Sequence, residues 1–453
     1  MNELFPTFSR CFLAARRVGS RFVRLSGRVA RRTCKPAILT LLVLNALLTA
    51  SNYLERKYMK RHLIPASEWS MSRYESSKNP YRHYEVAVRL LPDEDLRIFG
   101  QLWGSEYSYY STMPPTHEQL ARALAHIQPA IIELRKGAAC SGKDFQFAYK
   151  RPSLSEPFCE HIILYRLARM AAFDAMRKLD QGNTKDSLGE LLSIVEMGDD
   201  IGRDSPLIGG RISRIGYAKL HRALGSGKLS AAEHRMVAAE LDRICSERPS
   251  LRRVMEGEYS WSRGGLEEIL RADWDEYVQI LTECCADPVI FLRKSLPGMK
   301  IRIVHNHNRI WAAILDSCDL SYPELMRRDI GKVGLKAVPI CYAFTPDLSR
   351  FFGANALNKA LDKGLMLVAA LEAYRLEHET YPEKLHQLVG PYIRKVPTDP
   401  FTDGKSFVYS RKDARYLLYS IGPDMKDDGG KATSLEKISD ENGDIVFAPD
   451  VVL

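Results

Sequence analysis

One apolar run dominates the hydrophobic pattern of the chain: residues 36–54, PAILTLLVLNALLTASNYL. At helical rise, its nineteen residues match the roughly 30 Å hydrocarbon core of a bilayer, and none of them is charged. The only strongly polar side chain near its centre is Asn45. We therefore predict one membrane-spanning helix at residues 36–54.

The residues before this run are strongly basic. Nine arginines and lysines oppose one acid, Glu3, so residues 1–35 carry a local charge of +8. Because the whole chain carries +9, the rest is almost neutral, which argues against nucleic acid as a partner. Positive flanks stay in the cytoplasm, so we expect residues 1–35 to be a cytoplasmic arm. In a bacterium, the anchor would then lie in the inner membrane and the body would be periplasmic.

The N-terminal arm and anchor leave alternatives open. A cleaved signal peptide would place Leu48 where a small side chain is required, so an uncleaved anchor is favoured. Five arginines share one helical face, which would let the arm lie on anionic lipid: Arg17, Arg21, Arg24, Arg28 and Arg31. An organelle transit peptide, or charge that serves only to orient the anchor, would give the same composition.

Beyond the anchor, the pattern predicts a stalk at 55–110, a helical domain at 111–350 and a further domain at 351–453. Helix starts are marked by capping pairs at Thr116 and Gln119, and at Ser230 and Glu233. Ser205 followed by proline marks a third start.

Apolar residues of the helical domain recur at helical intervals, and turn residues separate segments of about twenty residues. The expected breaks are Gln181–Asn183, Gly225–Gly227 and Asp287-Pro288. Short breaks favour antiparallel helical hairpins. The array loosely resembles tetratricopeptide stacking, although no strict 34-residue repeat is present. It would serve either as a binding scaffold or as a plain helical spacer.

The last hundred residues show a different pattern. Asn355 is expected to cap a long helix, which Pro382 would end. Its apolar stripe comprises Leu357, Leu361, Leu365, Val368, Leu371 and Tyr374. A short helical turn at 385–389 and β-rich runs at 406–410, 416–421 and 444–448 follow, and they predict a hairpin with a third strand. The predicted fold class is therefore mostly α, with a C-terminal α+β head in which the long helix packs on a small antiparallel sheet.

Several short motifs follow one another in this head. They are Tyr381-Pro382, Val396 to Pro400, Tyr416 to Ser420, Gly422-Pro423-Asp424, Gly429-Gly430 and Gly443-Asp444-Ile445. In this order, residues 357–447 resemble the soluble head of the major pseudopilin of type II secretion systems. The resemblance implies a calcium site after the hairpin, with acidic ligands at Asp424 and Asp444, a carbonyl such as that of Ile421, and further oxygens at Asp427 or Asp428.

The composition of this loop agrees with calcium. Calcium takes six to eight oxygen ligands in a flexible cage. Residues 424–444 hold five aspartates, one of which is Asp440, together with Asn442 and three glycines. The spacing is not that of an EF-hand. The alternative is a solvated acidic loop held by ordinary Asx and glycine turns.

The chain also departs from the pseudopilin pattern. In pseudopilins, a processed leader precedes an apolar helix that runs directly into the head. Here about three hundred residues separate the apolar span from the head, and neither a Gly-Phe pair nor an acidic fifth position precedes it. We therefore expect the head to be a module of an anchored protein that does not polymerise as pseudopilins do.

Candidate catalytic residues are few. The nine cysteines are scattered, and seven of them, an odd number, fall in the body. His305 and His307 are candidates for metal ligands, but residues two apart share a face only on a strand, and no third ligand is evident. We therefore expect them to be structural or solvent-exposed. Six acids surround Trp261 and Trp274 and would suit a glycoside hydrolase: Glu256, Glu258, Glu267, Glu268, Asp273 and Asp275. The alternative is the solvated face of an amphipathic helix. No nucleotide-binding, zinc-protease or serine-hydrolase motif is present.

The favoured hypothesis is a non-enzymatic, single-pass envelope protein with a helical scaffold and a pseudopilin-like head. Its expected partners are membrane lipid, through the anchor and the arm, and other envelope proteins, in secretion or envelope assembly. The alternative is an exported hydrolase that acts on an envelope or polysaccharide substrate near Trp261.

Overall fold

The computed structural model describes ten stretches of the chain. They are residues 79–92, 94, 98–99, 116–140, 157–203, 205–271, 299–328, 348–412, 414–431 and 443–448. The predicted arm and span therefore lie outside the described residues. Within the described part, no helix is both long enough and apolar enough to cross a membrane.

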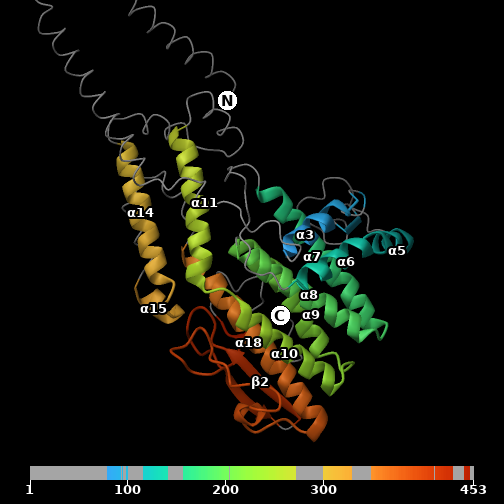
Figure 1. Cartoon of the computed structure of the whole chain (residues 1–453). Helices are drawn as coiled ribbons and strands as arrows, with labels where there is room; N and C mark the ends of the chain where they lie inside the picture. The colour runs from blue at the N-terminus through green and yellow to red at the C-terminus, as the bar shows by residue number, and fades with distance from the viewer. Residues whose placement is uncertain are drawn as a thin grey trace, which may run out of the picture. The chain divides into compact units, whose positions relative to one another are not determined.

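The chain forms two compact units. One comprises Met1–Leu63 and Leu292–Arg302, of which only 299–302 are described; the other comprises Ile64–Phe291 and Ile303–Leu453. The described residues are mostly helical, with a three-stranded antiparallel sheet near the C-terminus (Figure 1). This confirms the coarse fold class predicted from the sequence.

Four consecutive helices of the larger unit pack together, with the second of them in contact with the other three (Figure 1). They are α7 (Pro157–Asp180), α8 (Thr184–Gly202), α9 (Pro206–Leu224) and α10 (Ala231–Glu247). The chain turns at 181–183 and at 225–227, as predicted, and Gly182 and Gly227 have positive φ angles there. The expected break at Asp287-Pro288 lies outside the described residues.

The predicted helix starts are confirmed. Thr116 precedes α5 (His117–His126) and Ser230 precedes α10, and each exchanges hydrogen bonds with the residue three positions on. The helix α9 begins at Pro206, directly after Ser205, but the Ser205 side chain makes no capping bond. These ends are set by contacts within four residues, which explains why the sequence predicts them.

The helices α8 and α9 touch backbone to backbone. A Cβ atom at Gly209 would lie 2.3 Å from the carbonyl oxygen of Gly198 and 2.3 Å from the nitrogen of Gly202. Any side chain at position 209 would therefore push the two helices apart.

An unpredicted helix, α3 (Pro80–Arg89), lies in the stretch where the sequence predicts a stalk. It packs against α6 (Gln128–Ala138). Its Tyr84 is fully buried and donates a hydrogen bond of 2.7 Å to Asp200 of α8. This part of the stretch therefore belongs to the core.

Three further helices follow α10: α11 (Leu251–Arg271), α14 (Met299–Ser317) and α15 (Tyr322–Arg327). Side-chain hydrogen bonds join α11 and α14, which run side by side in Figure 1. The side chains of Trp261 and Glu268 on α11, and all of Trp274, Asp273 and Asp275, lie outside the described residues.

The long C-terminal helix α18 runs from Leu348 to His378. It therefore begins seven residues before Asn355, so our prediction of Asn355 as its cap was wrong. The expected domain boundary at residues 350–351 lies inside this helix. A short 3-10 turn, Leu385–Leu388, follows at the predicted place. All members of the predicted apolar stripe except Tyr374, which is half-buried, are buried: Leu357, Leu361, Leu365, Val368 and Leu371.

The sheet has the strand order β1-β2-β3: β1 (Val408–Lys412), β2 (Arg415–Ser420) and β3 (Ile445–Val446). Val408 pairs with Tyr419, and Tyr419 pairs with Val446 on its other side. The two strands pair as far as Lys412 and Arg415, so the hairpin connection is shorter than the one predicted from Arg411 to Arg415. The three strands otherwise lie within one or two residues of the predicted runs.

Residue Phe447, directly after β3, joins the sheet to the helices. Its nitrogen donates to the Leu418 carbonyl at 2.8 Å, and its own carbonyl lies 3.3 Å from the His221 ring on α9. Its ring occupies the space that a side chain at Gly364 of α18 would need. The nearest ring carbon would lie only 2.2 Å from a Cβ atom at that position. Glycine at 364 is what lets the ring reach the core.

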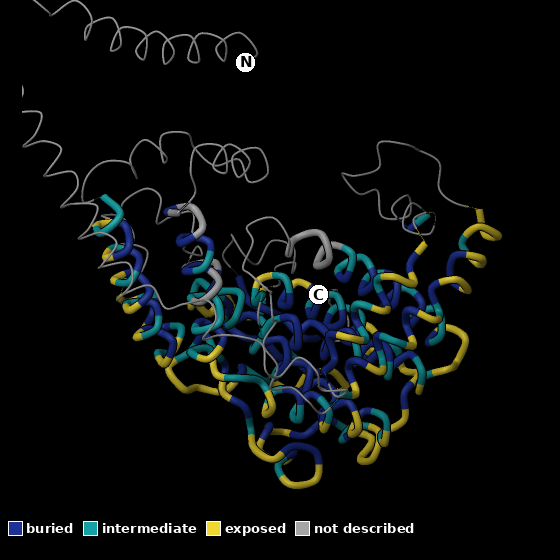
Figure 2. Tube along the Cα trace, turned by 45° about the horizontal axis from the view of Figure 1, so that its top comes forward, coloured by how far each residue is buried: buried dark blue, intermediate teal, exposed yellow. Residues whose placement is uncertain are grey.

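One hydrophobic core extends from α3 to Phe447. The helix α18 packs against α9 and α10 on one side and against β2 on another. In Figure 2 the buried positions gather in the interior of this unit, and the exposed ones lie mainly at the connections between helices. The helical domain and the head therefore share a core.

A buried arginine connects four helices within this core. Arg248, at the end of α10, has a side chain only 16% exposed. Its guanidinium donates to Asp199 of α8 and, at 2.5 Å, to Asp362 of α18. Tyr217 of α9 donates to the other Asp362 oxygen. Asp362 is fully buried, so Arg248 supplies the positive charge that both carboxylates require.

We expect Arg248→Met to lower the free energy of unfolding by about 3–5 kcal/mol, because two buried carboxylates would lose their counter-charge. Chemical denaturation followed by circular dichroism would measure the change. The control is Arg252→Met, because Arg252 pairs with Asp319 on the surface, where the cost should stay below about 1 kcal/mol. Equal losses in the two variants would contradict the role assigned to Arg248.

Candidate functional site

The acidic loop after β2 is the first candidate site. Asp444 is buried, and its carboxylate accepts hydrogen bonds from the backbone of Gly430 at 2.7 Å and of Asp428 at 3.4 Å. Asp427 accepts from the Tyr419 hydroxyl at 2.9 Å and from a nearby backbone N–H group. Both carboxylates therefore fix the conformation of the loop.

Asp424 differs from its neighbours in one respect. One of its carboxylate oxygens accepts a hydrogen bond of 3.2 Å from the backbone N–H group of Lys426. The other oxygen is buried and has no hydrogen-bond partner among the described residues. A buried oxygen of this kind suits a cation ligand. The Asp444 carboxylate has about four acceptor positions, so it retains capacity for a cation beside its two backbone hydrogen bonds.

The structure does not gather the predicted ligands into one cluster. Within the described part of the chain, no three acidic, histidine or cysteine side chains are placed to hold a metal ion. Asp440 and Asn442 lie outside the described residues. The Ile421 nitrogen is 3.1 Å from Asp399, which fixes the backbone at that predicted carbonyl ligand.

Asp399 is a structural residue that the ligand prediction did not include. It is 2% exposed and accepts from the Ser420 hydroxyl at 2.8 Å and from the backbone of Phe401 and Ile421. Burial raises the pKa of its carboxyl group, against the effect of these hydrogen bonds. Asp399 ties the proline-rich link to the end of β2, where the acidic loop begins.

A larger opening lies between α6, α8 and α10. This cleft has a volume of about 870 Å³. Its apolar lining includes Leu192, Ala138 and Met236, and Met236 is 41% exposed. Its charged lining comprises Arg135, Arg203, Arg243, Glu196, Glu240 and Glu247. No local sequence pattern marks this cleft, because its walls come from three helices separated in the chain.

One arginine organises the acidic wall of the cleft. Arg243 contacts Glu240 at 2.7 Å, Glu196 at 2.8 Å and Glu247 at 2.5 Å. The Glu240 hydrogen bond is the main cause of the raised pKa of Arg243. Glu240 and Glu247 thus share one guanidinium, which gives this wall an excess of negative charge.

The other two arginines of the cleft are paired with aspartates that do not line it. Arg135 lies 3.3 Å from Asp186, and Arg203 lies 3.8 Å from Asp200. The charge of the cleft therefore comes mainly from the carboxylates around Arg243, and a positively charged group would be attracted to it.

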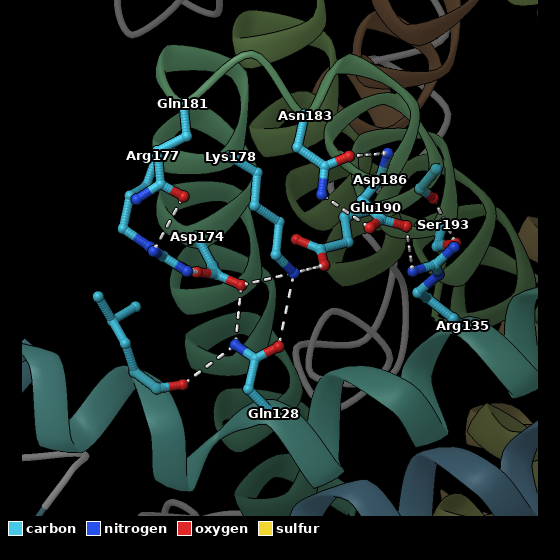
Figure 3. Close-up of polar contacts among 12 residues, drawn as sticks. Gln128, Arg135, Asp174, Arg177, Lys178, Gln181, Asn183, Asp186, Glu190 and Ser193 are labelled. Atoms are coloured by element: carbon cyan, nitrogen blue, oxygen red, sulfur yellow. Dashed lines mark hydrogen bonds and ion pairs between the residues drawn. The ribbon is translucent and has the colours of Figure 1, made fainter.

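A second polar cluster joins α6, α7 and α8 (Figure 3). Lys178 lies between Asp174, at 2.8 Å, and Glu190. Gln128 donates to Asp174 at 2.8 Å, and Arg177 does so at 2.7 Å. One lysine thus serves two buried carboxylates, and Asp174 has the additional donors.

The two carboxylates respond differently to burial. Burial raises the pKa of Glu190 to about 7, and its second oxygen has no hydrogen-bond partner among the described residues. Burial also disfavours ionised Asp174, but hydrogen bonds from Lys178, Gln128 and Arg177 outweigh this effect and lower its pKa. Asp174 is therefore the ionised partner of Lys178 at neutral pH.

The histidines occupy structural positions on α14. His305 is exposed, whereas His307 is fully buried and forms a 2.8 Å hydrogen bond with the Ser262 hydroxyl. Burial, together with nearby Arg263, lowers the pKa of His307 to about 3, so it is neutral. Ser262 also accepts from the Trp311 indole at 3.1 Å. His307 therefore acts as a core hydrogen-bonding group, as predicted.

Four of the six acids proposed for glycoside chemistry lie on α11, and Asp273 and Asp275 lie outside the described residues. Glu256 and Glu267 each lie about 4 Å from an arginine, Arg253 and Arg263 respectively. The two acids are eleven positions apart, which is about 16 Å along a helix. Glycosidase carboxylates lie about 5–9.5 Å apart, so these two do not form such a pair. Glu267 is buried, so it is not part of a solvated face either.

Comparisons with family models, with curated proteins and with solved structures find no match for this chain. The assignment of a function therefore rests on the geometry described above and on the sequence patterns.

The Glu190 cluster should make stability depend on pH. The folded-state pKa of Glu190 is above that of the unfolded chain, so folding favours its protonated form. The free energy of unfolding should therefore fall, by up to about 3 kcal/mol, as the pH rises from about 5 to about 8. Glu190→Gln should remove this component, which denaturation at a series of pH values would measure.

Asp186→Asn provides the control, because Asp186 lies in the same region and its side chain is 45% exposed. A hydrogen bond from Asn183 is the main cause of its lowered pKa, so it stays ionised throughout that pH range. Its substitution should shift stability by a constant amount. If Glu190→Gln shows the same pH dependence as the unmodified chain, Glu190 does not titrate as described.

Proposed function

We propose that this chain is a non-enzymatic, membrane-anchored scaffold whose extracytoplasmic body binds a protein partner in the cleft between α6, α8 and α10. It would act in the bacterial envelope, in secretion or envelope assembly. The observation that carries the proposal is the cleft itself.

The lining of the cleft indicates the chemistry of its partner. Leu192 and exposed Met236 offer apolar contact, and methionine adapts to different partner shapes. Glu240 and Glu247, beside Arg243, offer negative charge. A protein segment with an apolar side chain next to a lysine or arginine fits both features.

The proposed location rests on the sequence pattern. Residues 36–54 have the length and composition of a membrane span, and the basic residues before it favour a cytoplasmic N-terminus. The anchor and the Arg-rich arm would contact lipid, and the body would face the periplasm.

The proposed pseudopilin-like head is supported by the order of its elements. The helix α18 packs on a three-stranded antiparallel sheet, and an acidic loop follows the hairpin of β1 and β2. We propose that Asp424 and Asp444, with the Ile421 carbonyl and oxygens of Asp427 or Asp428, would hold calcium there. The buried, unbonded oxygen of Asp424 supports this assignment.

Calcium at about 1 mM should raise the melting temperature of the purified chain by about 2–4 °C, because a bound ion stabilises the folded state. Asp424→Asn should abolish the rise. The control Asp403→Asn removes an exposed acid of the same head, paired with Arg327, and should retain the rise. No rise in the unmodified chain, measured by calorimetry, would exclude calcium binding.

Met236→Arg should block the cleft, because it replaces an exposed apolar side chain with a larger charged one. The measurement uses a photo-cross-linker attached to a residue of the cleft, in membranes of cells that express the chain. The cross-linked product with a partner protein should be lost in this variant. The control Leu376→Arg makes the same change at an equally exposed residue of α18, outside the cleft lining, and should leave the adduct unchanged.

Two results would contradict the proposed function. An adduct that persists in Met236→Arg would remove the cleft as the binding site. Recovery of the full chain in the soluble cytosolic fraction would remove the anchored location.

A further inference from the structure

The helix α9 carries a row of basic residues on one face. Four of them fall at intervals of three, five and three positions, which places them within about 140° of the helix circumference. They are Arg211, Arg214, Lys219 and Arg222. Arg211 and Arg222 are exposed, and Arg214 and Lys219 are half-buried at the edges of the row.

These cations lack the acidic partners that other basic residues of the chain have. Arg135, Arg243 and Arg252, for example, each form an ion pair. Within the described part of the chain, Arg211, Lys219 and Arg222 form none. Asp180 is close enough for the charge of Arg222 to act on it, but it is bonded to Lys228.

Among the described residues, Arg214 has only a weak, neutral partner. Its guanidinium lies 3.4 Å from the side-chain oxygen of Asn358 on α18. The row therefore has a single sign of charge along about 16 Å of helix, the rise over its eleven positions.

The pKa values of two residues in the row agree with this excess of positive charge. Burial, followed by the positive charges of Arg222 and Arg169, lowers the pKa of Lys219. Burial, followed by the charge of Arg211, lowers the pKa of Arg214. Neighbouring arginines thus repel Lys219 and Arg214, and a bound anion would relieve this repulsion.

Apolar side chains lie between the cations. Ile215 and Ala218 fall between Arg211 and Arg222 on the same face of α9, and both are half-buried. The helix α9 packs against α7 and α18, and Tyr165 of α7 is close enough to affect the Arg214 charge. The surface therefore alternates positive charge with apolar contact.

We propose that this face of α9 binds an acidic segment of a partner polypeptide, with carboxylates at Arg211, Lys219 and Arg222 and apolar side chains against Ile215 and Ala218. Guanidinium groups match carboxylates in a bidentate geometry. The face shares no residue with the cleft lining, so it is a second binding surface, beyond the proposed function.

The alternation of charge and apolar contact favours a polypeptide over other polyanions. Polyphosphate and the backbone of a nucleic acid duplex present negative charges with no apolar groups between those charges. A flat lipid surface would reach Arg211 and Arg222 but not the half-buried Lys219. An acidic peptide with leucines between its glutamates satisfies all these positions.

Binding of such a peptide to the full chain in nonionic detergent would test the proposal. The probe is a fluorescein-labelled twelve-residue peptide of alternating Glu and Leu, followed by fluorescence anisotropy. The double variant Arg211→Gln and Arg222→Gln should weaken binding at least tenfold, because two charge-assisted contacts are lost. Added salt should weaken binding to the unmodified chain more than to the variant.

The control combines Arg252→Gln with Arg327→Gln, which removes the same charge from two other exposed sites. It should bind the probe like the unmodified chain, and Met236→Arg should do so as well. Equal melting temperatures of the two double variants would show that both fold.

Three outcomes would overturn the proposal. The first is equal probe binding by the unmodified chain and the Arg211→Gln/Arg222→Gln variant. The second is equal binding of a control peptide in which Gln replaces every Glu. The third is tighter binding of inorganic polyphosphate, duplex DNA or anionic lipid vesicles than of the acidic peptide, which would assign the face to that class of ligand.

Discussion

The arrangement of the four central helices depends on one ionic contact, in which Arg248 lies between Asp199 and Asp362. A buried charge is costly unless it is paired, so these helices must approach in a way that keeps all three groups together. Asp362 belongs to the helix that carries the C-terminal sheet. The contact therefore fixes the position of the sheet relative to the helical hairpins, and non-directional apolar packing alone would specify this position less strictly.

The sequence predicts those parts of the fold that depend on neighbouring residues. The helix starts at Thr116 and Ser230 follow from side chains three positions away, and the strands follow from short β-rich runs. The cap predicted at Asn355 fails because packing of Phe351 and Phe352 extends the helix beyond the local signal. The helix α3 escapes prediction because it is only ten residues long and its stability comes from contacts such as that of Tyr84 with the core.

The candidate sites are less predictable, since they depend on tertiary arrangement. The acidic loop is visible in the sequence as a cluster of aspartates, but only the structure shows that Asp444 is bonded to the backbone while Asp424 retains an unbonded oxygen. The cleft requires α6, α8 and α10 to converge, and Arg243 meets Glu196 across 47 positions of the chain. No local pattern encodes such a pairing, although the acids that surround Arg243 on its own helix are visible at helical spacing.

The position of Phe447 has a consequence for how the protein folds. Its carbonyl lies against His221, 226 positions earlier in the chain, and its ring occupies the space left by Gly364. Local helical hairpins can form while the polypeptide is still being synthesised, but this part of the interior stays open until residue 447 arrives. Contacts over such long separations slow folding, because the intervening chain must first lose its freedom. The order of synthesis thus makes closure of the core a late event, and the apolar surface around Gly364 stays accessible to chaperones until then.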